Sequence, residues 1–80
     1  MPTFHIGGFK MRFYSNDHTP AHVHCINGDG VVVVDIATGA VRSVKGGIRD
    51  PDIARAVNLV EEHRDRLTRE WTAFDLRRHR

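Results

Sequence analysis

The hydrophobic pattern of this 80-residue chain changes once, near residue 50, and this change constrains the fold more than any other feature. Before residue 50, apolar side chains alternate with polar ones, which is the period of a β-strand with one buried face. After residue 50 they recur every three or four residues, which is the period of an amphipathic helix. The chain contains no repeat, no low-complexity tract and no linker. We therefore expect one α+β domain that covers residues 1–80.

The first part of the chain predicts about four strands joined by turns. The strands are "FKMRFY" (9–14), "HVHCI" (22–26), "VVVVDI" (31–36) and "VRSV" (41–44), and an extra short strand around Phe4–Ile6 is left open. The segments between them, "SNDHTP", "NGDG", "ATGA" and "KGG", are rich in residues that favour turns. Because strands that are consecutive in the chain and joined by short turns usually pair, we predict an antiparallel β-meander.

The last part of the chain predicts one long C-terminal helix. Asp50 is suited to the N-cap, Pro51 to the first helical position, and Asp52 to the positive end of the helix dipole. The apolar residues after them fall on one stripe: Ile53, Ala56, Val57, Val60, Leu67, Trp71 and Phe74. We predict that this stripe packs on one face of the sheet.

Composition narrows the class of protein. A domain of this size buries a small core and usually gains stability from a metal, a disulfide or a partner. Cys25 is the only cysteine, which favours a reducing compartment. No apolar run approaches the roughly 18 residues that span a bilayer, and "MPTFHIGGFK" does not look like a secretion signal. We expect a cytoplasmic protein without a membrane partner.

The "NGDG" connection (27–30) allows the strand register to be predicted. If it is a four-residue hairpin loop that pairs Ile26 with Val31, then His24 lies opposite Val33 and His22 lies opposite Asp35. One face of the sheet is then entirely apolar and should meet the helix. The other face carries His22, His24, Val33 and Asp35, and the alternation of the first strand adds Arg12 and Tyr14 to it.

Acid–base chemistry on a phosphodiester is one interpretation of this cluster. His22 and His24 would divide the roles of base and acid, because imidazole titrates near neutral pH. Arg12 would hold the phosphate, Asp35 would orient His22, and Tyr14 would stack on a base or donate a proton. Such an enzyme would be a metal-independent ribonuclease and would need no cofactor.

Two other interpretations remain open. His22 and His24, with Asp35 or His18 as a third ligand, could hold one divalent ion such as Zn²⁺ or Fe²⁺. Alternatively the cluster is structural or part of a non-enzymatic partner-binding surface. In that case Asn16, Asp17, His18 and Pro20 form a turn, and His22 and Asp35 are a simple cross-strand pair.

The valine strand and the basic C-terminus bear on partners. "VVVV" is apolar on both sides, and such strands are usually covered on both sides, so we expect a homodimer or a protein partner. The formal charge is +2 with neutral histidines, and the chain ends in "RRHR". A basic end can attract RNA or an acidic partner, but the interpretation we favour is a solvated terminus.

At "RFYSNDHTPAHVHC…VDIATGAV" the chain resembles a family of small, mostly bacterial proteins classed as domain of unknown function 4160. The matching positions are Met1–Thr3, Arg12, Tyr14, Asn16, Asp17, His18, Pro20, His22, His24, Asp35, Ile36, Thr38, Gly39 and Trp71. The chain departs from the family pattern at Thr19, where Pro is common, and in its longer basic tail. The resemblance implies no settled activity. It implies a toxin–antitoxin-like gene pair, and hence a small regulatory module.

Overall fold

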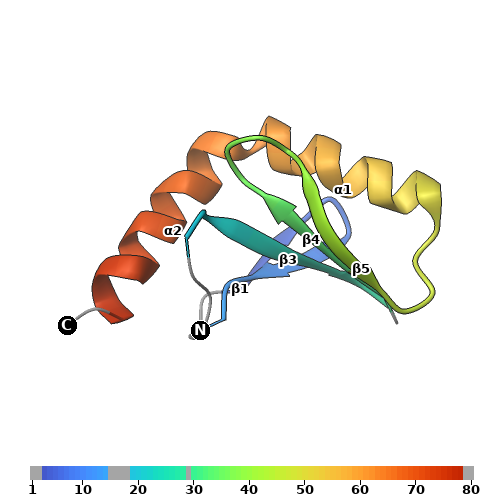
Figure 1. Ribbon diagram of the computed structural model, residues 1–80, viewed down its shortest axis with the longest axis horizontal. Coiled ribbons are helices and arrows are strands. Elements are labelled where there is room, and N and C mark those ends of the chain that lie inside the picture. Colours follow the sequence, from blue (N-terminus) through green and yellow to red (C-terminus); the bar gives the residue numbers. More distant parts are fainter. Residues whose placement is uncertain (1–2, 15–18, 29, 79–80) are drawn as a thin grey trace.

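The computed structural model describes residues 3–14, 19–28 and 30–78 and shows a five-stranded antiparallel sheet with two helices (Figure 1). The elements are β1 (Thr3–Ile6), β2 (Phe9–Arg12), β3 (His22–Asn27), β4 (Gly30–Asp35), β5 (Val41–Lys45), α1 (Asp50–Glu62) and α2 (Arg64–Arg78). Strand order in the sheet is the order along the chain, so the predicted α+β meander is confirmed. The expected number of four strands is one too low, because the segment around Phe4–Ile6 pairs with β2 as β1.

The β3–β4 register is the one predicted from the hairpin. His22 pairs with Asp35, His24 with Val33, and Ile26 with Val31. The connection itself is shorter than expected, because Asn27 also pairs with Gly30. Gly28 lies at a φ of +57°, a conformation that favours glycine, and this allows so tight a turn.

The predicted single helix is wrong, since the structure contains two. α1 ends at Glu62, and the backbone of His63 has a φ of −107° and a ψ of 22° before α2 begins. The sequence contains no proline or glycine here to signal the break. The N-cap is Arg49 rather than Asp50, because the carbonyl of Arg49 accepts the amide hydrogen bonds of Asp52 and Ile53.

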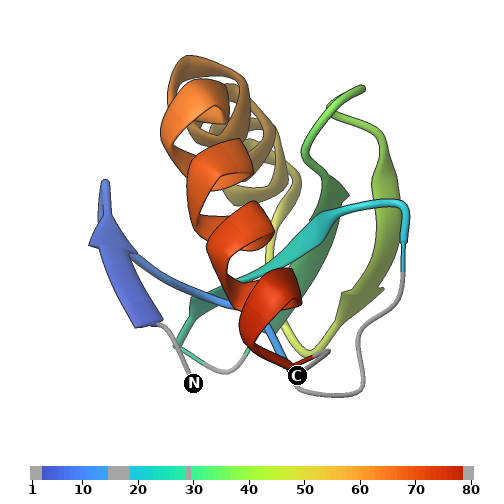
Figure 2. The same ribbon diagram turned by 90° about the vertical axis from the view of Figure 1, so that its left-hand side faces the viewer.

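The core lies between the helices and one face of the sheet, which Figure 2 shows curving around the helical layer. It contains the predicted apolar face of the strands and most of the helical stripe: Ile6, Phe9, Met11, Phe13, Val23, Cys25, Val32, Val34, Ile36, Ala56, Val60, Leu67, Trp71 and Phe74. Phe13 is central, since its ring centroid lies 5.3 Å from that of Trp71 and 5.6 Å from that of Phe74. α2 is therefore tied to the sheet by aromatic contacts.

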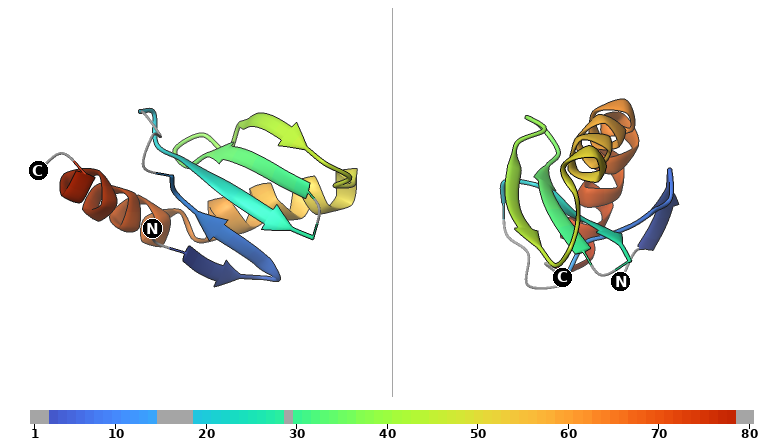
Figure 3. Two further views of the ribbon diagram at one scale, coloured as in Figure 1. Left: turned by 90° about the horizontal axis from the view of Figure 1, so that it is seen from below. Right: turned by 90° about the vertical axis from the view of Figure 1, so that its right-hand side faces the viewer.

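Among the described residues, no helix is long and apolar enough to span a membrane. Seen from below, the strands lie in front of α1, whereas much of α2 extends past the end of the sheet (Figure 3, left). The sheet therefore has one face packed against helices and a second face that these helices leave uncovered.

Candidate functional site on the open face of the sheet

The uncovered side, called here the open face, is defined by the strand register. One row across the sheet contains Lys10, Ile26, Val31 and Lys45, and the next contains Arg12, His24, Val33 and Ser43. A third row contains His22 and Asp35, which pair across β3 and β4, and Arg42, which contacts both. Tyr14 follows the end of β2, and its ring contacts His24. Apart from the buried His22, these side chains are half-buried or exposed, whereas the alternating residues of β2, β3 and β4 are buried. The alternation of the strands thus builds the surface.

Three of the predicted site residues contact one another in series, with Tyr14 between Arg12 and His24. The Arg12 guanidinium lies 5.2 Å from the centroid of the Tyr14 ring. The Tyr14 ring meets the His24 ring edge-on, with 4.5 Å between centroids. The Nε atom of Arg12 is buried and has no hydrogen-bond partner in the described part of the chain. A buried guanidinium nitrogen without a partner costs free energy, so this position of Arg12 calls for an explanation beyond packing.

His22 lies next to this group but is more enclosed. Its ring centroid is 5.6 Å from that of His24, and only 7 % of the residue is exposed. The ring also packs against Trp71 of α2, with 5.7 Å between centroids. Its Nδ1 atom lies 3.0 Å from the carbonyl oxygen of Pro20 and 3.0 Å from Nη1 of Arg42. The sequence predicts both histidines on the face that the helix leaves bare, and the structure buries one of them at the end of the sheet.

Asp35 reaches His22 through Arg42 rather than directly. The Nε atom of Arg42 lies 2.8 Å from Oδ1 of Asp35, and the two side chains are 37 % and 19 % exposed. This contact is an ion pair without hydrogen-bond geometry, since Oδ1 has no hydrogen-bond partner among the described residues. Arg42 therefore contacts both members of the predicted His22–Asp35 pair.

The sequence did not point to Arg42 because a β-bulge changes its direction. Val33 pairs with Ser43, but Val34 pairs with Val41, so Arg42 is an additional residue in β5. Regular alternation would place Arg42 on the same side as Val44, which pairs with core Val32. The bulge turns its side chain to the open face instead, as bulges commonly do. The contact between Trp71 and His22 was not predicted either, because the helical spacing of Trp71 indicated only that it belongs to the core.

The open face is basic. Among the described residues it carries four cationic side chains, Lys10, Arg12, Arg42 and Lys45, and one carboxylate, Asp35. The carboxylate is already paired with Arg42, so the other three cations have no acidic partner in these rows. Such a distribution attracts phosphate groups.

The metal and turn hypotheses depend in part on residues whose structure is not described. Among the residues that the structure describes, no group of three His, Cys, Asp or Glu side chains is arranged to hold a metal ion. Asp35, one candidate third ligand, is paired with a cation. The other candidate, His18, lies outside the described residues, as do Asn16 and Asp17 of the predicted turn. The metal hypothesis stays a prediction.

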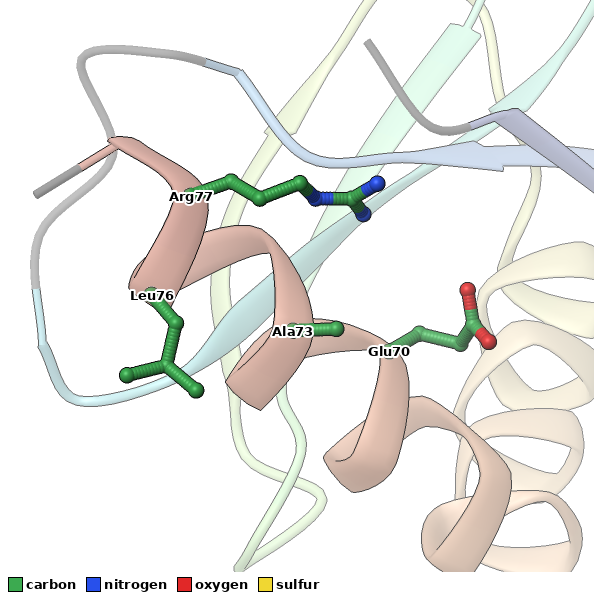
Figure 4. A pocket seen from close by; sticks show the side chains of 4 residues that line it. All are labelled: Glu70, Ala73, Leu76 and Arg77. Carbon is green, nitrogen blue, oxygen red and sulfur yellow. The ribbon is translucent and has the colours of Figure 1, made fainter. Parts of the chain in front are cut away.

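A separate pocket lies on α2. It has a volume of about 620 Å³ and is lined by Glu70, Ala73, Leu76 and Arg77. In Figure 4 the Glu70 carboxylate and the Arg77 guanidinium extend to the same side of the helix, whereas Leu76 points elsewhere. None of these residues belongs to the cluster on the open face.

Comparison with known proteins identifies the chain only at the level of a family. The model of a domain of unknown function (DUF4160) matches residues 8–72. No curated protein and no solved structure matches the chain. The matched range includes β2 to β5, and therefore the described residues of the cluster.

Proposed function

The chain belongs to the DUF4160 family, whose function is not known, and we propose that the open face of its sheet binds single-stranded RNA. The observation that supports this most directly is the contact series Arg12–Tyr14–His24 on a basic, uncovered sheet face. We propose further that the protein acts as a small regulatory or toxin–antitoxin-like module, as its family resemblance implies.

The residue types of the open face suit the two parts of an RNA strand. Phosphates are attracted by cations such as Lys10, Arg12 and Lys45, and this attraction weakens with salt because counterions are released on binding. Unpaired bases stack on aromatic side chains, which Tyr14 and His24 provide. Arg12 brings the two kinds of group into direct contact, because its guanidinium lies against the Tyr14 ring, which in turn contacts His24.

Binding of a short fluorescein-labelled single-stranded RNA, measured by fluorescence anisotropy, tests this proposal. Tyr14→Ala should weaken binding by about 1–3 kcal/mol, the cost of losing one stacked base. Lys10→Ala should weaken binding to all sequences and reduce the slope of log affinity against log salt by about 1. Arg69→Ala is the matched control, because Arg69 is exposed on α2.

Two results would contradict RNA binding by this face. One is unchanged affinity in both Tyr14→Ala and Lys10→Ala. The other is a loss of affinity in Arg69→Ala as large as that in Lys10→Ala, which would move the binding surface to the helix.

Protein binding by the same face is a second candidate, and its apolar centre favours it. Ile26, Val31 and Val33 are only partly buried and lie side by side on the open face. A second copy of the chain or another protein would cover them. Light scattering at increasing concentration tests self-association: a doubled mass that Val33→Lys returns to that of a monomer would support a dimer. A monomeric mass at all concentrations would exclude self-association through this face.

A further inference from the structure

We infer that RNA bound on the open face is also cleaved there, by attack of a ribose 2′-hydroxyl, with His24 as general base and Tyr14 as general acid. This inference rests on the proposed RNA binding and adds a reaction to it. It also changes the roles that the sequence predicted for the two histidines.

Burial distinguishes the two imidazoles. His24 is half-buried on the open face and meets the Tyr14 ring edge-on, with 4.5 Å between centroids. His22 is 7 % exposed, packs against Trp71, and has Nδ1 contacts at 3.0 Å to both Pro20 and Arg42. A phosphodiester on the sheet can therefore meet His24, whereas His22 acts as a positioning residue that supports the His24 ring and holds Arg42.

The groups around His24 supply the parts of a transesterification. His24 accepts the proton of the 2′-hydroxyl, and the 2′-oxygen forms a bond to phosphorus. The bond between phosphorus and the 5′-oxygen breaks, and the 5′-oxygen takes the proton of the Tyr14 hydroxyl. The His24 imidazolium then returns a proton to Tyr14 through solvent, so the enzyme ends unchanged. The products are a 2′,3′-cyclic phosphate and a 5′-hydroxyl.

Arg12 is placed to stabilise the charge that develops on the phosphoryl oxygens. Its guanidinium lies over the Tyr14 ring, and its Nε atom is buried without a hydrogen-bond partner among the described residues. Hydrogen bonds from a fixed guanidinium to a pentacovalent phosphate are stronger than those to the ground state, because the transition state carries more negative charge.

The test compares binding and cleavage on the same oligonucleotides with chelator present. One is a short single-stranded RNA, and the other is the same RNA with a single 2′-deoxynucleotide at the mapped cleavage position. Wild-type protein should cut the first to a 2′,3′-cyclic phosphate, and should bind the second equally well without cutting at that position. His24→Gln and Tyr14→Phe should each slow cleavage about 100-fold or more, which is the usual contribution of a general acid or base. The Kd for RNA should change by a smaller factor than the cleavage rate.

His63→Gln is the matched control for a histidine-to-glutamine change outside the site, since His63 lies between α1 and α2, away from the open face. It should cleave like wild type. An adventitious nuclease would cleave equally in all variants, His24→Gln included. Near-ultraviolet circular dichroism of each variant shows whether it is folded.

Binding without cleavage would overturn this inference and leave the proposed RNA binding unaffected. Cleavage that is unaffected by His24→Gln and Tyr14→Phe would also overturn it, whereas failure to bind either oligonucleotide would overturn the proposed function itself.

Discussion

At the scale of single residues, the Nδ1 atom of His22 is shared by two groups with opposite requirements. To donate to the carbonyl of Pro20, 3.0 Å away, Nδ1 must carry a proton; to accept from Arg42, also 3.0 Å away, it must not. Arg42 is held in turn by Asp35. An anion that drew Arg42 away would therefore favour the tautomer of His22 that donates to Pro20. The proposed phosphate binding would therefore be coupled to the position of the proton on His22.

Cys25, unlike His22, lies in the core and is not one of the site residues on the open face. It is fully buried in the core, and burial raises the pKa of its thiol to about 12. The unfolded chain loses this proton at lower pH than the folded chain. The stability that the neutral thiol contributes is therefore present below about pH 9 and is lost as the pH rises toward 12.

We predict that the free energy of unfolding falls more steeply between pH 8.5 and pH 10 in wild type than in Cys25→Ala, by about 1 kcal/mol over this range. Urea denaturation at each pH measures the difference. Cys25→Ala lowers stability at every pH through its cavity, so the slope is compared rather than the absolute value. Equal slopes in the two proteins would show that the thiol ionises as readily in the folded state as in the unfolded state.

At the scale of elements, regular periods are predictable from the sequence, whereas the interruptions of those periods are not. The β3–β4 register and the buried stripe of the helices were predicted because alternation and helical spacing persist over several residues. The bulge at Arg42 and the break at His63 were missed, because no proline or glycine stands at either position to mark it in the sequence. Of the candidate site, five residues were predicted together, whereas Arg42 required the three-dimensional structure.

Packing between the β3–β4 hairpin and the segment before α1 gives a prediction at this scale. A Cβ atom on Gly30 would lie 2.6 Å from Cβ of Ile48 and 3.0 Å from its backbone nitrogen, so the backbone of one segment would have to move. A Cβ atom on Gly47 would meet nothing within 4 Å. Neither glycine has a positive φ, so the two positions differ mainly in the space around them.

Gly30→Ala should therefore destabilise the protein by about 1–3 kcal/mol, the usual cost of overpacking. Gly47→Ala should leave stability unchanged or raise it by about 0.4–1 kcal/mol, because alanine restricts the unfolded chain. Thermal unfolding monitored by circular dichroism compares the two variants with wild type. Equal effects at both positions would mean that Ile48 does not pack closely on the hairpin.

At the scale of the whole molecule, the two helices lie on one side of the sheet (Figures 1 and 3). The open face on the other side is basic, aromatic and partly apolar. One series of contacts on or beside this face contains the five predicted catalytic residues, Arg12, Tyr14, His24, His22 and Asp35, and Arg42 links Asp35 to His22 within it. A chain of this size has little interior in which to enclose a ligand, so a sheet surface is a suitable place for a binding site.

The most direct test of RNA binding by the open face is an NMR titration of isotope-labelled protein with single-stranded RNA. We predict that chemical-shift changes concentrate in β2, β3 and the β5 bulge, with Arg12, Tyr14, His24 and Arg42 among the largest, and that the exposed residues of α2 change little. Shift changes confined to α2 and the C-terminal tail, or no changes at RNA concentrations above that of the protein, would contradict RNA binding by this face.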